Sequence, residues 1–192
     1  MIASSEEVAR SLAGAWELLQ RRPTELRRLD FTARGFYHSF WSVPLAAPAF
    51  VTVLAAERAR EGLLVEGAGL FDNWELVGHA LWFLAATWLM LPVIGYGFAR
   101  LLNLHQRIVP FIIACNWSSV FAALFLAIPA LLFAIGWATP GLSTLYAFAF
   151  LFIVVQMRWF VAKATLGVSD GVAAALIACE LAGASAMGVL AV

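Results

Sequence analysis

The sequence predicts an all-α fold, a polytopic transmembrane helix bundle of five spans with its N-terminus in the cytoplasm and its C-terminus outside. Composition is the first reason: 63% of the 192 residues are hydrophobic and 12% are charged, whereas about a quarter of the residues of a soluble domain are charged. The mean hydropathy is +0.88. The second reason is that long apolar runs alternate with short charged connections, as in multi-span membrane proteins.

The placement of basic residues predicts the orientation. Two of the twelve, Arg58 and Arg60, follow the first apolar run. The other ten share the opposite side: Arg10, Arg21, Arg22, Arg27, Arg28 and Arg34 before the first run, Arg100 and Arg107 after the second, and Arg158 and Lys163 at the end of the fourth. Because cytoplasmic loops carry the excess of Lys and Arg, we expect that side to be cytoplasmic. Arginine far outnumbers lysine, which is typical of a GC-rich bacterial genome, and the expected location is therefore a bacterial inner membrane.

Residues 1–35 form the predicted cytoplasmic segment, and residues 4–22 within it have the pattern of an amphipathic helix. Apolar side chains recur at helical intervals from Val8 to Leu19. Ser4 and Glu7 have the spacing of a capping box, and Pro23 ends the pattern. Such a helix either lies in the lipid headgroup layer or packs on the loops of the bundle, and the residues favour neither.

Residues 36–192 form the predicted transmembrane domain, without a second soluble domain. Each of its apolar runs is near the roughly 20 residues that cross about 30 Å of hydrocarbon. Pro44 and Pro48 predict a kink in the first span. The five spans are expected at about residues 36–56, 76–99, 109–136, 142–163 and 170–191.

The last span has the most regular internal pattern. Small residues recur at every fourth position, in a ridge formed by Ala174, Ala178, Ala182 and Ala186. Membrane helices associate through small residues, because lipid provides no hydrophobic force between helices. Further small residues surround this ridge. We therefore expect the ridge to be a helix-packing surface and neighbouring helices to enclose the span.

Glu180 is the acid expected deep in the membrane. It lies ten residues past Asp170, about 15 Å along a helix and so at the middle of a ~30 Å core. An ionisable residue at that depth needs a partner. Arg158 is the predicted one, because a tight turn at Gly167 makes spans four and five antiparallel neighbours and leaves the two residues about 6 Å apart in depth.

Two amides compete for a place in this polar cluster. Gln156 matches the depth of Glu180 more closely than Arg158 does, but it is turned about 200° from Arg158 on the helix, so both cannot face the acid. Asn116, in the third span, fits either arrangement. The role of Glu180 stays open among a structural clamp, a proton or cation relay, and a contact to another subunit or a lipid headgroup.

The remaining motifs favour no enzyme, cofactor or metal. His38, His79 and His105 are scattered without ligand spacing, and Ser118 and Ser119 lack a matched histidine and acid. Cys115 and Cys179 stand in apolar runs, where they are typical buried thiols. A nucleic-acid partner would need a basic face on a soluble domain, and the chain has none.

The second half of the chain resembles the bacterial branch of the Yip1-domain proteins. The similar residues are Trp159-Phe160-Val161-Ala162-Lys163 and Leu166-Gly167-Val168-Ser169-Asp170-Gly171-Val172-Ala173, where a small-residue turn leads into an alanine-rich last span. Tyr37-His38-Ser39-Phe40-Trp41 stands in place of the Asp-Leu-Tyr-Gly-Pro motif of the eukaryotic members. The resemblance implies five spans, a cytosolic N-terminal segment and a non-enzymatic function.

These observations together predict a non-enzymatic integral membrane protein that acts as a scaffold, assembly factor or accessory subunit of a membrane complex. Its expected partners are the lipid bilayer and other membrane subunits or further copies of itself. The alternative is a small transporter or channel component that uses Glu180 inside the membrane.

Overall fold

Helices make up nearly all of the described part of this computed structural model, residues 4–61 and 74–190, and no strand occurs in that part. In chain order they are α1 (Ser5–Leu19), the 3-10 helix η1 (Pro23–Arg28), α2 (Ala33–Ser39), α3 (Ser42–Glu61), α4 (Trp74–Leu101), the 3-10 helix η2 (His105–Arg107), α5 (Ile108–Ala134), α6 (Pro140–Leu166) and α7 (Asp170–Leu190). The all-α fold class is therefore confirmed.

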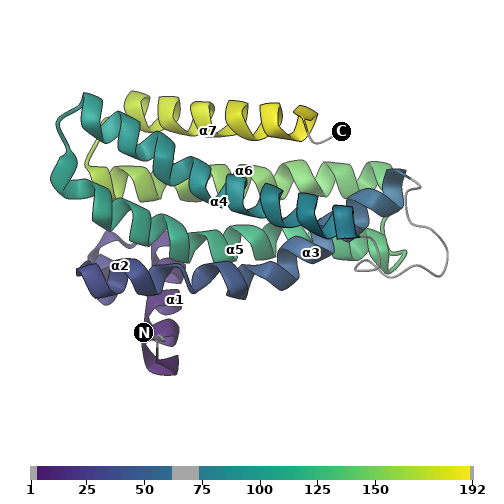
Figure 1. Cartoon of the computed structure of the whole chain (residues 1–192), viewed down its shortest axis with the longest axis horizontal. Coiled ribbons are helices and arrows are strands. Elements are labelled where there is room, and N and C mark those ends of the chain that lie inside the picture. The colour runs from purple at the N-terminus through teal and green to yellow at the C-terminus, as the bar shows by residue number, and fades with distance from the viewer. Residues whose placement is uncertain (1–3, 62–73, 191–192) are drawn as a thin grey trace.

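Four stretches are long and apolar enough to cross a membrane, in agreement with the first four expected spans: Ala33–Ala56, Leu84–Leu101, His105–Ala134 and Pro140–Leu166. Helices α4 to α7 begin and end within three residues of their expected bounds. The long helices run roughly along one direction, with α5 between α3 and α6, whereas α1 crosses them at a steep angle (Figure 1). Most of the expected outer connection, residues 62–73, lies outside the described residues.

The first span is interrupted at a different place from the expected one. The α-helix is interrupted by a turn at Phe40 and Trp41, ahead of both prolines, and α3 then continues through Pro48. Pro44 stands in the first turn of α3, where a helix does not use the backbone N–H. Residue 35, the expected boundary between the N-terminal segment and the transmembrane domain, lies inside α2.

The N-terminal helix α1 packs on the bundle helices themselves. Ala15 and Leu18 are fully buried in the core that α5 and α6 also supply. Of the two alternatives for this helix, packing on loops is therefore not observed, and a position in the headgroup layer stays a prediction. Ser4 Oγ accepts the Glu7 N–H at 3.2 Å, as an N-cap should. The Glu7 side chain does not complete the capping box, because it is paired with His38.

A tight turn sets α6 and α7 antiparallel, as the sequence predicts. Gly167 ends α6 in the left-handed conformation, with φ of 66°. A Cβ atom there would overlap the Arg107 guanidinium, which donates from Nη1 to the Leu166 carbonyl at 2.9 Å. Lys163 and Asp170 form an ion pair across the turn. Glycine is thus required by the backbone conformation, and a larger residue would also displace the end of the Arg107 side chain.

Helix α7 lies along one edge of the bundle (Figure 1) and is not enclosed by its neighbours. One side packs on α4 and α6 and buries Ala173, Leu176, Ile177 and Glu180. The alanine ridge is exposed at all four positions, Ala174, Ala178, Ala182 and Ala186. No helix in the described part of this chain covers the ridge, and its expected role as a helix-packing surface stays a prediction.

Candidate intramembrane polar site

Arg158 and Glu180 form an ion pair between α6 and α7. Arg158 Nε lies 3.1 Å from Glu180 Oε1, and the two side chains are only 18% and 10% exposed. The antiparallel arrangement of α6 and α7 brings the two side chains together, across the offset of about 6 Å in depth that the sequence predicts. Arg158 Nη2 also donates to Ser119 Oγ on α5 at 3.4 Å. The guanidinium therefore links three helices, and each interaction counts for more at this burial than it would in water.

The Glu180 carboxylate is only partly satisfied. Its Oε2 atom is buried and has no hydrogen-bond partner within the described part of the chain. A buried acceptor without a partner costs free energy, of the order of 1–3 kcal/mol or more for a charged group. The ion pair either outweighs the free-energy cost of this unpaired oxygen, or the oxygen gains a partner by binding a proton or a ligand.

The other two members of the predicted polar cluster lie elsewhere. Gln156 Oε1 accepts from Arg21 Nη2 at 2.9 Å, which ties the end of α1 to α6. Asn116 is buried and donates from Nδ2 to Ser39 Oγ at 2.9 Å. The structure thus joins Arg158 with Glu180 and gives each amide a separate partner from the N-terminal part of the chain.

These hydrogen bonds also set the height of the ion pair in the bundle. Ser39, just before the start of α3, is level with Asn116 on α5. Ser119 lies one helical turn further along α5, about 4.5 Å, and bonds Arg158. Measured along α3, whose first residue is Ser42, the ion pair is therefore near the helix start, whereas along α5 Ser119 lies about halfway between His105 and Ala134. The expected depth of Glu180 at the middle of the membrane stays a prediction.

The sequence reasoning missed a second buried pair, between α1 and α2. His38 Nδ1 lies 2.6 Å from Glu7 Oε1, with the side chains 3% and 9% exposed. Arg34 Nη2 approaches the other Glu7 oxygen at 3.7 Å. No local pattern signals this pair, because the two residues are 31 positions apart and the position of Glu7 is already explained locally by its capping-box spacing. The pair fastens α1 to the start of the first span.

The described side chains do not assemble into a recognisable reactive centre. No group of three His, Cys, Asp or Glu residues among them has metal-binding geometry. Ser118 Oγ and Ser119 Oγ both donate to the Cys115 carbonyl, at 3.0 and 2.8 Å, in the back-bonding typical of membrane helices. Both serines therefore have roles within α5.

The four apolar helices and the buried interhelical polar pairs are those of a helical membrane protein. No protein-family model matches the chain, and neither a curated protein nor a solved structure does.

Proposed function

We propose that this chain is a non-enzymatic membrane protein that acts as a scaffold, assembly factor or accessory subunit, with α7 as its contact to a helix of another subunit. The supporting observation is a contrast between exposed surfaces. The exposed side of α7 carries the small residues of the alanine ridge, whereas α6 exposes Leu145, Phe148 and Phe152. Large apolar side chains suit lipid, while small ones allow another helix to approach closely.

Native mass in a mild detergent tests this proposal. We expect the wild-type chain to be extracted in a larger complex and the double variant Ala178→Leu/Ala182→Leu to be released from it, because leucine would hold a partner helix away. Ala149→Leu, on the exposed side of α6, is the matched control and should remain in the complex. A wild-type chain that is monomeric when extracted from its native membrane would overturn the proposal. A complex of identical copies would instead identify the partner as the chain itself.

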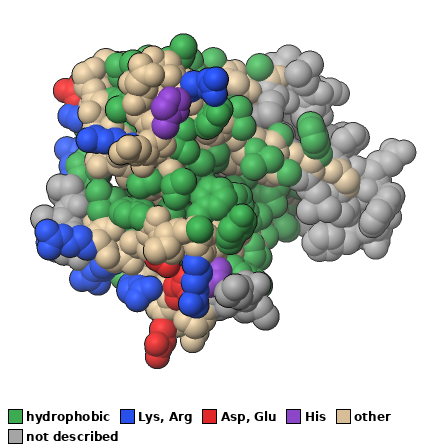
Figure 2. Space-filling model, turned by 60° about the vertical axis from the view of Figure 1, so that its left-hand side comes forward, with side chains coloured by type: hydrophobic (Ala, Val, Ile, Leu, Met, Phe, Trp, Pro, Cys, Tyr) green, Lys and Arg blue, Asp and Glu red, His purple; other side chains and the backbone are tan. Residues whose placement is uncertain are grey.

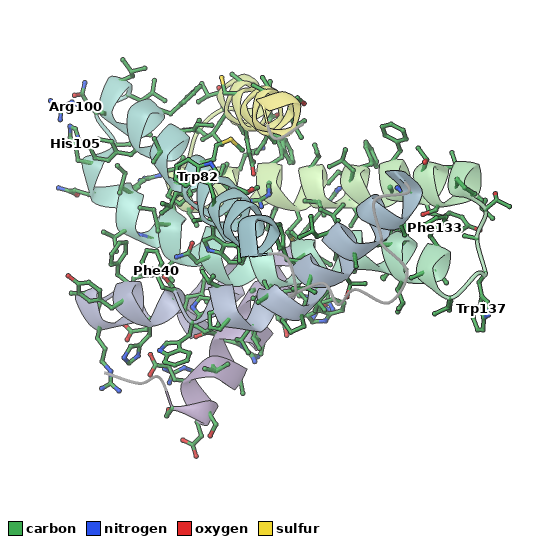
Figure 3. All side chains as sticks on the ribbon, turned by 45° about the vertical axis from the view of Figure 1, so that its right-hand side comes forward. Phe40, Trp82, Arg100, His105, Phe133 and Trp137 are labelled. Carbon is green, nitrogen blue, oxygen red and sulfur yellow. The ribbon has the colours of Figure 1, made fainter. Side chains whose placement is uncertain are left out.

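The proposed topology has five spans, with the N-terminus and the α4–α5 and α6–α7 connections in the cytoplasm of a bacterium. Arg100 and Arg107 at the α4–α5 connection and Lys163 near the end of α6 support this orientation. Figure 2 shows blue Lys and Arg side chains around the rim of this end of the molecule, and Figure 3 shows Arg100 and His105 at one end with Phe133 and Trp137 at the other. Helix α7 has 21 residues, enough for about 30 Å.

Labelling with a membrane-impermeant thiol reagent checks this topology. In a background without the two native cysteines, Leu102→Cys and Ser169→Cys should react only after the membrane is opened, and Trp137→Cys should react in intact cells. A reporter fused after Val192 should be active on the outer side. If the reporter and Ser169→Cys are found on the same side, α7 does not cross and the five-span topology is wrong.

A small transporter or channel component is the second candidate, and the unpartnered Oε2 of Glu180 favours it. A carboxylate oxygen that lacks a partner inside a membrane protein is typical of a proton or cation site. Ion or proton flux into liposomes that is lost in the Glu180→Gln variant would establish this function. Equal flux in both proteins, or none in either, would leave the scaffold as the better account.

A further inference from the structure

A cavity of about 230 Å³ lies beside the ion pair, between α3, α4, α5 and α6. Its lining on α5 extends from Cys115 to Leu126, about 16 Å along the helix. Helix α4 packs on α5 and α7 and only weakly on α3. The cavity is therefore left open beside the middle of α4. The volume is somewhat smaller than that of a drug-sized ligand site, so its occupant must be slender.

The cavity has a polar end and an apolar end. Asn116, Ser119 and Arg158 line the part that is level with the start of α3, on the side of α1. Further along the bundle the wall is formed by apolar side chains that include Phe50, Leu84 and Leu126. With α1 lying across the bundle at the level of the polar end (Figure 1), a molecule in the cavity has its head on the side of α1 and its tail directed away from α1. Lipids of the adjacent leaflet have this same orientation.

The polar end offers several hydrogen-bond donors. Arg158 carries five N–H groups. Its two described interactions, with Glu180 and Ser119, do not use all of these donors. Trp88 also lines the cavity, and its indole N–H is buried with no acceptor among the described residues. The Ser119 hydroxyl already donates to a backbone carbonyl and accepts from Arg158. A complementary head must therefore accept hydrogen bonds.

Charge restricts the head further. Arg158 and Glu180 together carry no net charge, so a neutral acceptor leaves the site neutral. A carboxylate would add a second negative charge close to Glu180 in a medium of low dielectric, where like charges repel strongly. The carbonyl of an acyl ester satisfies both conditions, since it accepts hydrogen bonds and is uncharged.

We propose that this cavity binds a single acyl chain through its neutral ester carbonyl, taken from the leaflet nearer α1. The ester carbonyl accepts from Arg158 and Trp88, and the chain lies against Phe50, Leu84 and Leu126. This site is independent of the scaffold function, because it faces away from the exposed ridge of α7.

Photolabelling of the full chain in liposomes tests the site. The probe is the methyl ester of a fatty acid that carries a photoactivatable diazirine near the end of its chain, with the labelled peptides mapped by mass spectrometry. We expect label on α4 and α5 around Leu84 and Leu126, displaced by methyl dodecanoate, less by dodecanoate and not by dodecane. Competition by dodecane equal to that of the ester, or stronger competition by dodecanoate, overturns the proposal.

Two variants separate binding from folding. Ala123→Phe fills the cavity from α5 and should abolish the label, whereas Ala149→Phe, on the exposed side of α6, should leave it unchanged. Trp88→Phe keeps the shape of the wall and removes one donor, so the ester should bind roughly fivefold more weakly, as expected for one hydrogen bond. Undiminished labelling of Ala123→Phe, or an unchanged affinity of Trp88→Phe, contradicts the proposed site.

Discussion

Replacement of Arg158 by alanine is expected to destabilise the folded chain by about 3–5 kcal/mol, the usual cost of removing one member of a buried ion pair. The reason is that Glu180 remains, with its side chain only 10% exposed and Oε2 already without a partner among the described residues. Ser119 would also lose the guanidinium that connects α5 to the pair. The effect should be visible as a loss of folded protein after extraction in a mild detergent, and as a lower midpoint in a denaturant titration.

A double-mutant cycle separates the charge from the packing. Glu180→Gln combined with Arg158→Ala should recover part of the stability, because no uncompensated charge is left in the interior. Gln156→Ala, two residues away on the same helix, is the control. It loses an exposed hydrogen bond to Arg21 and should cost no more than about 1 kcal/mol. If Arg158→Ala is harmless while Gln156→Ala prevents folding, the assignment of the partner is wrong.

Gly95→Ala is expected to be the most damaging small substitution in α4. A Cβ atom at this position would overlap the ring of Phe111, a side chain that is 1% exposed in the core. The ring cannot move without disturbing the contact between α4 and α5, so the overlap should cost about 1–3 kcal/mol. The same titration in detergent measures this loss.

The chain supplies its own control for this substitution. At Gly97, two residues further along α4, a Cβ atom would meet no neighbouring side chain or helix within 4 Å. Gly97→Ala should therefore be neutral or slightly stabilising, since alanine favours a helix over glycine by about 1 kcal/mol. Phe111→Leu should partly rescue Gly95→Ala by making room. Equal losses for both glycine variants would show that the overlap with Phe111 is not the cause.

The helices and the partner of Glu180 follow from local rules. The bounds of α4 to α7 are close to the expected ones, because apolar runs, charged connections and the glycine at 167 are all read from neighbouring residues. The pairing of Arg158 with Glu180 follows from the same information, since a short turn places two helices antiparallel and the helical rise then gives the offset. The resemblance to Yip1-domain proteins stays a prediction.

The face of α7 that packs was not accessible in this way. Small residues lie on every side of α7, so the sequence of this helix does not indicate which side is buried. The buried side is decided by the bulky side chains that α4 and α6 place against α7. One of them is Met90, whose sulfur approaches Gly183. The depth of Glu180 changes when it is measured from α3 instead of α7, because the helices are of unequal length and staggered. Stagger is a property of contacts between helices.

The amino-acid sequence by itself determined the helical class, the bounds of most helices and one buried ion pair, since these depend on apolar periodicity and on residues near each other along the chain. Only the tertiary structure decided the attachment of α1, the pairing of Glu7 with His38 and the cavity beside Arg158. These features arise where segments distant in sequence meet, as Arg21 and Gln156 do across 135 positions. Such meetings are set by the fit of several helices at once, for which no single stretch of sequence carries a signal.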